Sequence, residues 1–341
     1  MPPMLRFTMS SAALYDWELE QIDFDTAFLN GILETEVYLE PPPGYDDDPA
    51  HPVKLWCWAL DKAIYGLKDA GRTRYLTLTR AMLDLGFERC QSDLGAFVLR
   101  LDNSMLIVGV STDDCLCALP DIELITAFKE EIGQVYALKD LGPAHWLLSM
   151  EIIRDRPART LQLGQRSYVN TIMQRYNLEE CRTYTTPMDV NVKLSPEDSP
   201  KTGEEHAQMR GVPYREIIGA LNYLVRCTRP DIALPVSILS QFLDNPGPAH
   251  AAALRRLCGY VRLTRDMRLV LGERDEKDGL IGWTDSDGMT QWHRRAMSGY
   301  VFQWNGGTIA WSAKKQELVS LSTTEAEYVA QTHAAKEAMW L

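Results

Sequence analysis

MLIVGV (residues 105–110), STDD (111–114) and CLCAL (115–119) follow one another in the first half of the chain. Two apolar runs flank a short polar segment, and neither run alternates with polar residues. This pattern predicts a β-hairpin that is buried on both faces. Two adjacent acids, Asp113 and Asp114, would lie at the tip of that hairpin.

A third acid lies in WELEQID (17–23), where alternating apolar and acidic residues predict a strand. Asp23 has the parity of Trp17 and Leu19, so we expect it on the face that looks inward. A carboxylate there is costly unless a partner compensates its desolvation. Three acids from two strands can hold divalent metal ions. Paired aspartates are also common in hairpin turns, so the pattern alone leaves both interpretations open.

The remaining sequence predicts further helices, strands and one exposed connection. A helix is expected over 74–86, an exposed connection over 186–213, and helices over 214–272 that Pro230 and residues 245–248 interrupt. Four short strands are expected at 280–284, 298–304, 308–312 and 318–321. STTE (322–325) predicts the cap of a final helix.

Composition limits the class of protein. The 341 residues carry 35 Lys+Arg and 47 Asp+Glu, a formal net charge of −12, which disfavours nucleic-acid binding unless positive charge is locally clustered. Seven scattered cysteines predict neither a disulfide framework nor a structural zinc site. The sequence contains neither an apolar run of the ~20 residues that span a membrane nor a signal peptide. We therefore expect an intracellular protein, cytoplasmic or nuclear, that is neither secreted nor bound to a membrane.

A series of motifs covers essentially the whole chain. They are QIDFDTAFLNG (21–31), EVYLEPPPGY (36–45), AIYGLK (63–68), the acids at 113–114, LKDLG (138–142), CTRPDIA (227–233), SILSQF (237–242), SGYVF (298–302), AWSAKKQ (310–316) and STTEAEY (322–328). In sequence and in order they resemble the reverse transcriptase and ribonuclease H segments of Ty1/copia-type retrotransposon polyproteins.

This resemblance implies an α+β fold in three segments. Residues 1–190 would form a reverse-transcriptase palm and the start of a thumb, 191–276 a helical thumb and connection, and 277–341 a truncated RNase H-like α/β domain. It also implies an RNA-directed DNA polymerase that uses two Mg²⁺ or Mn²⁺ ions per intact site. The implied partners are an RNA template, a DNA primer, deoxynucleoside triphosphates and the remainder of a polyprotein.

The resemblance also assigns roles to individual residues. Asp23, Asp113 and Asp114 match the three metal-binding acids of the palm. Phe28 matches an aromatic steric gate against a ribose 2′-OH, although a core aromatic would look the same. Lys68 would contact a phosphate of the nucleotide or template, although a solvated lysine after a glycine turn is an alternative.

In the last segment, Asp285 and Glu327 match the first Asp and the Glu of an RNase H metal site. Glu325 is assigned to the helix cap instead. Asp287 stays open between a ligand and a turn acid.

Several residues depart from the family pattern. Ser111 and Thr112 precede the paired acids, where a Tyr and a small apolar residue are usual. Asp69 replaces a Gln and places negative charge near the template, which opposes phosphate binding. Arg74 stands in place of an aromatic residue and Ser149 in place of a Gly. These departures favour a chain whose polymerase activity is weakened or lost.

The two ends of the match carry further expectations. The match begins at about Leu5, so the preceding fingers segment is expected to be absent. It stops at Leu341, before the block with the remaining RNase H acid, which predicts no RNase H activity. Three interpretations stay open: a competent reverse transcriptase, a non-catalytic retrotransposon remnant, and a nucleic-acid- or partner-binding module. The acidic balance disfavours the last.

Overall fold

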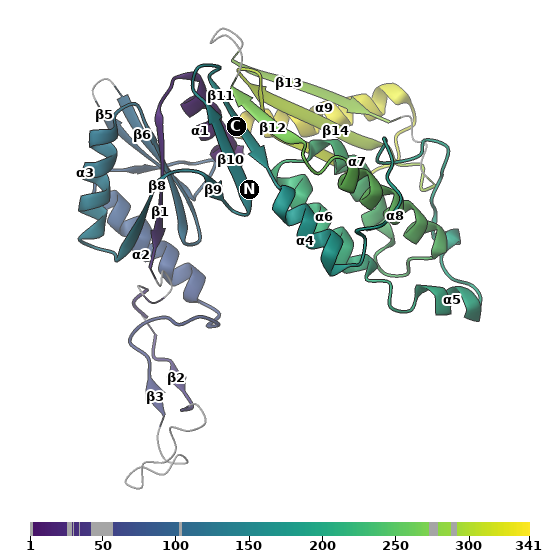
Figure 1. The fold of residues 1–341 in the computed structure, drawn as a ribbon, viewed down its shortest axis with the longest axis horizontal. Coiled ribbons are helices and arrows are strands. Elements are labelled where there is room, and N and C mark those ends of the chain that lie inside the picture. The colour runs from purple at the N-terminus through teal and green to yellow at the C-terminus, as the bar shows by residue number, and fades with distance from the viewer. Residues whose placement is uncertain are drawn as a thin grey trace. The chain divides into compact units, whose positions relative to one another are not determined.

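The computed structural model describes residues 3–25, 29, 31–33, 35–41, 57–101, 104–272, 279–287 and 292–341. Contacts divide the chain into two compact units (Figure 1). We call Glu18–Ala144 the inserted unit, and Met1–Trp17 with His145–Leu341 the split unit. Both contain helices and strands, so the predicted α+β class is confirmed. The boundaries of these two units differ from those of the three segments expected from the sequence (1–190, 191–276 and 277–341). The assignment of those segments to a palm, a thumb with connection and an RNase H-like domain stays a prediction.

One antiparallel sheet forms the centre of the inserted unit, with strand order β4-β5-β6-β7-β1-β8. The predicted hairpin is confirmed as β6 and β7, and the predicted strand at 17–23 is β1, which pairs with β7. The bounds are β1 Glu18–Phe24, β4 Glu88–Arg89, β5 Ala96–Leu101, β6 Ser104–Ser111, β7 Asp114–Leu119 and β8 Leu138–Pro143, while β2 Tyr38–Leu39 pairs separately with β3 Trp58–Ala59.

Two helices, α2 (Ala70–Asp84) and α3 (Ile122–Gly133), pack on one face of this sheet. Their apolar residues, including Met82 and Ile125, form a core with Ile22 and Phe24 of β1. Because side chains alternate along a strand, Asp23 lies on the opposite face. Asp23 shares that face with the buried Leu19, as the alternation of the strand predicted. The two helices pack on the other face of the sheet.

A buried ion pair fixes α3 against the sheet. Lys129 donates hydrogen bonds to Glu20 of β1 (2.8 Å) and to Asp140 of β8 (2.6 Å). Glu20 has the parity of Ile22 and Phe24 and therefore faces the helices. The pair explains how a strand with alternating acids can lie beneath a helix.

The split unit has two sheets and most of the helices. Its sheets have strand orders β12-β11-β10-β9 and β13-β14-β15. The bounds are α1 Pro3–Leu14, β9 Trp146–Leu147, β10 Met150–Asp155, β11 Thr160–Gly164, α4 Arg166–Arg175, η3 Pro196–Asp198, α5 Gly203–Met209, α6 Tyr214–Cys227, η4 Pro230–Ile232, α7 Ala233–Leu239, η5 Ser240–Phe242, α8 Pro248–Leu263, β12 Arg268–Gly272, β13 Leu280–Ser286, β14 Met297–Trp304, β15 Gly307–Lys315 and α9 Thr323–Trp340.

The prediction of a fourth strand at 318–321 is wrong. This segment bends toward the cap of α9, and Leu321 is 92% exposed, so its apolar residues have no sheet face to cover. The predicted cap is present, because the Ser322 side chain accepts a hydrogen bond from the backbone N–H of Glu325. The Glu325 carboxylate in turn accepts from the N–H of Leu321.

The first helix, α1, packs against β11, β12 and β15. Arg6 anchors it, donating to the backbone carbonyls of Ile309 and Arg226 while its guanidinium lies 4.1 Å from the centre of the Trp311 ring. Burial lowers the pKa of Arg6 to about 10. Residues from the beginning and the end of the chain therefore share one core.

All seven cysteines lie in the described part of the chain and are free, and four of them are buried. Among the described helices, none is both long and apolar enough to cross a membrane.

Two helical glycines give a matched test of packing. A Cβ at Gly259 of α8 would overlap the backbone carbonyl of Arg182, whereas Gly219 of α6 faces open space. We expect Gly259→Ala to lower the free energy of unfolding by about 1–3 kcal/mol, as overpacking does. Gly219→Ala is expected to raise it by up to about 1 kcal/mol. Urea unfolding measures both, and equal stability of the two variants would contradict the packing.

Candidate metal centre

The three acids predicted from the sequence lie together at one end of the hairpin. Asp23 of β1 is directly opposite Asp114 of β7 in the strand register. Side chains of directly paired residues project from the same face of a sheet. Asp113 is in the adjoining turn, and its backbone carbonyl accepts a hydrogen bond from Phe24 (3.0 Å). The structure thus brings together carboxylates that are about 90 residues apart in sequence, the separation of β1 and β7.

The turn itself is strained. Ser111 pairs with Asp114, which leaves a two-residue turn of Thr112 and Asp113. Thr112 has a φ of 53°, a left-handed conformation that β-branched residues rarely adopt. Such strain persists where the surrounding structure enforces it, and it concentrates at functional sites.

Each carboxylate has a different environment. Burial, followed by the negative charges of Asp114 and Asp113, raises the pKa of Asp23. Asp114 accepts a hydrogen bond from the side-chain amide of Gln21 (3.0 Å). Asp113 lies 4.0 Å from the guanidinium of Arg74 on α2. Negative charge is therefore concentrated around Asp23, where a bound cation would relieve it.

Sequence reasoning missed two neighbours of these acids. Gln21 belongs to the same strand as Asp23, but its contact with Asp114 follows from the register of β1 and β7. Lys139 of β8 is directly opposite Asp23 on the other side of β1, and its charge opposes the rise in the pKa of Asp23. The LKDLG motif contains Lys139, but no signal in it identified this pairing.

The donor chemistry fits a hard divalent cation, which binds carboxylate oxygens. One oxygen of Asp113, Oδ1, is buried without a hydrogen-bond partner. Even so, the described residues contain no group of three Asp, Glu, His or Cys side chains already arranged around one ion. Gln21 and Arg74 engage two of the acids instead, so the side chains must reorient to share an ion.

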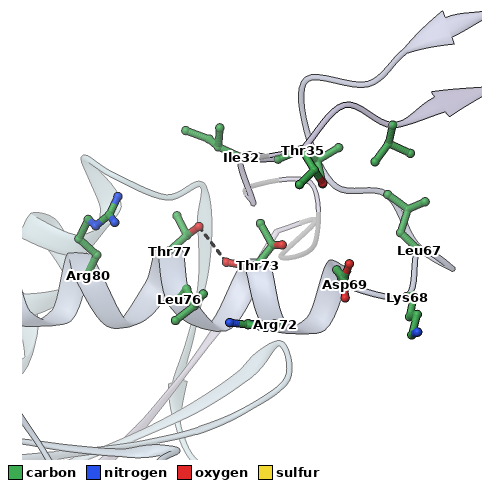
Figure 2. Close-up of a pocket in the computed structure, with 12 residues that line it drawn as sticks. Ile32, Thr35, Leu67, Lys68, Asp69, Arg72, Thr73, Leu76, Thr77 and Arg80 are labelled. Carbon is green, nitrogen blue, oxygen red and sulfur yellow. Dashed lines mark hydrogen bonds between the residues drawn. The ribbon is translucent and has the colours of Figure 1, made fainter.

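A groove of about 500 Å³ lies beside the first half of α2 (Figure 2). Figure 2 shows Lys68 in the segment before the helix and Arg72 and Arg80 on the helix. Asp69 also lines the groove. The predicted phosphate contact Lys68 is exposed here, and Arg72 and Arg80 line the same groove farther along α2 (Figure 2). Phe28 lies outside the described residues.

A second pair of acids lies in the split unit. Asp285 is near the end of β13, and Glu327 is in the second turn of α9. The Glu327 carboxylate accepts a long hydrogen bond (3.4 Å) from the backbone N–H of Ser286, next to Asp285. Asp287 accepts from the N–H of Met297 (2.7 Å), which is the behaviour of a turn acid. The structure therefore places Glu327 at the strand end that carries Asp285.

Comparison with known proteins decides the family. A family model described as reverse transcriptase (RNA-dependent DNA polymerase) matches residues 3–190. The chain belongs to the reverse transcriptase family. The chain is 39% identical over 339 residues to the retrovirus-related Pol polyprotein from transposon TNT 1-94 of Nicotiana tabacum. It is 33% identical over 340 residues to the corresponding polyprotein from transposon RE1 of Arabidopsis thaliana.

Both matches cover 99% of this chain, which spans only 25% and 22% of those two relatives. The putative transposon Ty5-1 protein of Saccharomyces cerevisiae is 27% identical over 317 residues, which is 93% of this chain and 100% of that protein. The expected membership in Ty1/copia-type Pol polyproteins is confirmed. Reverse transcriptases generally depend on divalent metal and act on a nucleic acid template with deoxynucleoside triphosphates.

Proposed function

We propose that this chain carries RNA-directed DNA polymerase chemistry, with Asp23, Asp113 and Asp114 as its metal ligands. The observation that carries the proposal is the register of β1 and β7, which sets Asp23 opposite Asp114 beside the turn that holds Asp113. In this proposal the inserted unit is the palm. Its partners are an RNA template, a DNA primer and deoxynucleoside triphosphates, and it acts inside the cell.

Two Mg²⁺ or Mn²⁺ ions, when bound, would activate the attacking hydroxyl and stabilise the leaving pyrophosphate. The protein contributes the ligand oxygens and their electrostatics. Asp23 carries a disfavoured negative charge, and Asp113 offers a buried oxygen without a hydrogen-bond partner. The Gln21 amide holds Asp114 in place from the neighbouring strand.

The groove beside α2 is the proposed contact for phosphates of the nucleotide or template. Lys68, Arg72 and Arg80 provide positive charge there, and Asp69 opposes it. Phosphate contacts of this kind hold nucleic acid without reading its sequence. Phe28 remains the proposed steric gate on the strength of its position in the motif.

For the split unit, we propose that its helices correspond to a thumb and connection and that residues 277–341 correspond to part of an RNase H-like domain. Asp285 and Glu327 would be metal ligands of that second site. The support is the contact of Glu327 with the end of β13.

Primer extension on an RNA template, with Mg²⁺ and deoxynucleotides, tests the polymerase proposal. The full chain is compared with Asp114→Asn and with Asp84→Asn, a matched change at an exposed acid in the last turn of α2. We expect extension by the chain and by Asp84→Asn, and none by Asp114→Asn. Equal extension by all three would mean that the three acids do not form the polymerase site. No extension by any of the three would favour the interpretation of the chain as a non-catalytic retrotransposon remnant.

A further inference from the structure

Arg74 projects from the beginning of α2 toward the hairpin turn. Its side chain is only 10% exposed, and its Nε lies 4.0 Å from Oδ1 of Asp113. The Asp113 side chain is 38% exposed, yet its Oδ1 is buried, so its exposure comes from other atoms. One oxygen of this carboxylate thus faces a buried positive charge.

Each of the two charged groups has a buried atom that makes no hydrogen bond to the described part of the chain. Nη2 of Arg74 and Oδ1 of Asp113 are both buried and, within the described residues, without a partner. A separation of 4.0 Å is too long for a hydrogen bond, so the two groups interact through charge alone. Buried charges in this condition are costly, and a group of opposite charge that approached either one would be favoured.

Other deeply buried arginines of this chain are engaged differently. Arg6 donates to backbone carbonyls and lies over Trp311, and Arg229 donates to Asp231 and Thr264. These contacts are those of structural arginines. The positive charge of Arg74 instead faces Asp113, one of the proposed metal ligands.

We propose that Arg74 is a positioning residue whose positive charge occupies the place of a divalent cation at Asp113 and weakens metal binding there. This inference rests on the proposed function of Asp113 as a metal ligand. An ion at the site must overcome repulsion from Arg74 and draw Asp113 away from it. The chain therefore requires a higher metal concentration than its three carboxylates alone would.

Binding of Mn²⁺ to the full chain, followed by the EPR signal of the free ion, tests this inference directly. An opposite charge within about 4–6 Å commonly changes the protonation equilibrium of a carboxylate tenfold or more. A divalent cation responds to the same field, so we expect Arg74→Gln to bind Mn²⁺ about tenfold more tightly or better. Arg74→Lys keeps the charge and is expected to stay close to the unmodified chain.

Asp113→Asn is the control that distinguishes coupling between Arg74 and Asp113 from a purely structural effect of Arg74. In the Asp113→Asn background, Arg74→Gln is expected to bring a smaller gain in Mn²⁺ affinity than in the unmodified chain, since only the direct repulsion between Arg74 and the ion remains. Equal affinity of the chain, Arg74→Gln and Arg74→Lys would overturn the inference, as would a gain that is just as large without Asp113. If Arg74→Gln loses its near-ultraviolet circular dichroism, Arg74→Met fills similar space without charge and carries the same expectation.

The same titration separates this inference from the proposed function. If Asp113→Asn and Asp23→Asn bind Mn²⁺ as the chain does, the acids are not metal ligands and both proposals fail. If those variants lose binding while Arg74→Gln changes nothing, the metal site stands and the role of Arg74 is refuted.

Discussion

Asp23→Asn is expected to abolish primer extension and, at neutral pH, to raise the melting temperature of the inserted unit. Loss of groups that merely orient metal ligands typically costs 10–100-fold, so loss of a ligand should cost about 100-fold or more. The gain in stability has a separate cause. Burial and the charges of Asp114 and Asp113 raise the pKa of Asp23, which means that its ionised form is disfavoured in the folded chain. Asparagine removes that charge.

The sign of the pH dependence follows from linkage. Because the pKa is higher in the folded state than its ordinary value of 3.8, the folded state binds the proton more tightly. The free-energy cost of the ionised Asp23 carboxylate is fully present above its pKa in the folded state. This cost disappears as the pH falls through that pKa toward 3.8. The advantage of Asp23→Asn in thermal unfolding should therefore be larger at pH 7 than at pH 4.

Asp140→Asn is the matched control, from the neighbouring strand β8. Burial alone would raise the pKa of Asp140, but hydrogen bonds from Lys129 and from the N–H of Gly142 together lower it. Its ionised form is therefore favoured in the folded chain, and Asp140→Asn should lower the melting temperature at pH 7. A lower melting temperature for Asp23→Asn as well would contradict the electrostatic picture of the site.

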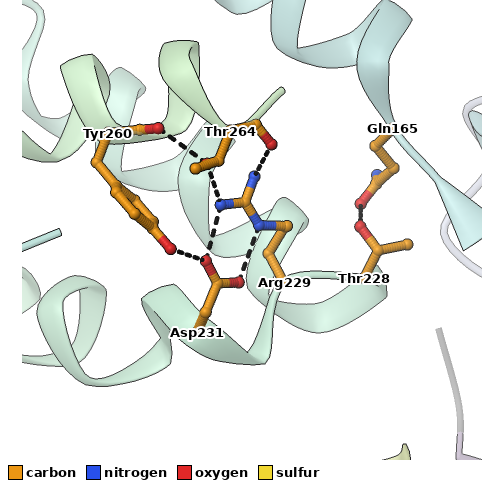
Figure 3. A network of polar contacts seen from close by, with 6 residues as sticks. All are labelled: Gln165, Thr228, Arg229, Asp231, Tyr260 and Thr264. Carbon is orange, nitrogen blue, oxygen red and sulfur yellow. Dashed lines mark hydrogen bonds and ion pairs between the residues drawn. The ribbon is translucent and has the colours of Figure 1, made fainter. Parts of the chain in front are cut away.

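Arg229→Ala is expected to destabilise the split unit by about 1.5–3 kcal/mol, because it removes the hydrogen bonds of a buried arginine to a charged partner. Arg229 is 2% exposed, and its guanidinium donates two hydrogen bonds to Asp231 (2.9 and 2.7 Å). It also donates to the carbonyl and hydroxyl oxygens of Thr264, while the hydroxyl of Tyr260 donates to Asp231 (Figure 3). Alanine would leave Asp231 without its cation.

Arg215→Ala provides the comparison at the surface of the same unit. Arg215 pairs with Asp244 at 3.1 Å, but the two side chains are 67% and 102% exposed. Such pairs contribute at most about 1 kcal/mol, so this variant should unfold almost as the chain does. Urea unfolding followed by circular dichroism measures both variants. Similar midpoints for Arg229→Ala and Arg215→Ala would refute the structural role of the network.

The hairpin, β1 and the main helices could be predicted because local pattern determines them. The apolar runs flanking STDD predict two strands whatever lies around them, and Pro230 interrupts the helical pattern where α6 gives way to η4. The strand expected at 318–321 failed because apolar residues alone do not make a strand. That segment pairs with none of the described strands, and Leu321 points into solvent.

The sequence could predict which acids form the candidate site, but not which neighbouring side chains determine their electrostatic environment. Motif order identified Asp23, Asp113 and Asp114, and the register of β1 and β7 brings them together. The neighbours that tune them, Gln21, Arg74 and Lys139, depend on strand register and on the direction of α2. These are tertiary properties, which spacing along the chain does not encode. Arg74 was visible in the sequence only as a departure from a family pattern.

The packing of α1 against β15 imposes an order on folding during synthesis. The hydrogen bond from Arg6 to Ile309 joins residues that are 303 positions apart. On a ribosome, the inserted unit emerges complete long before β15 does, and its own strands and helices can assemble at once. Helix α1 must wait for nearly the whole chain to be translated before its apolar face is covered. Since contacts of such long range form slowly, this helix is where a nascent chain would expose apolar surface to chaperones for longest.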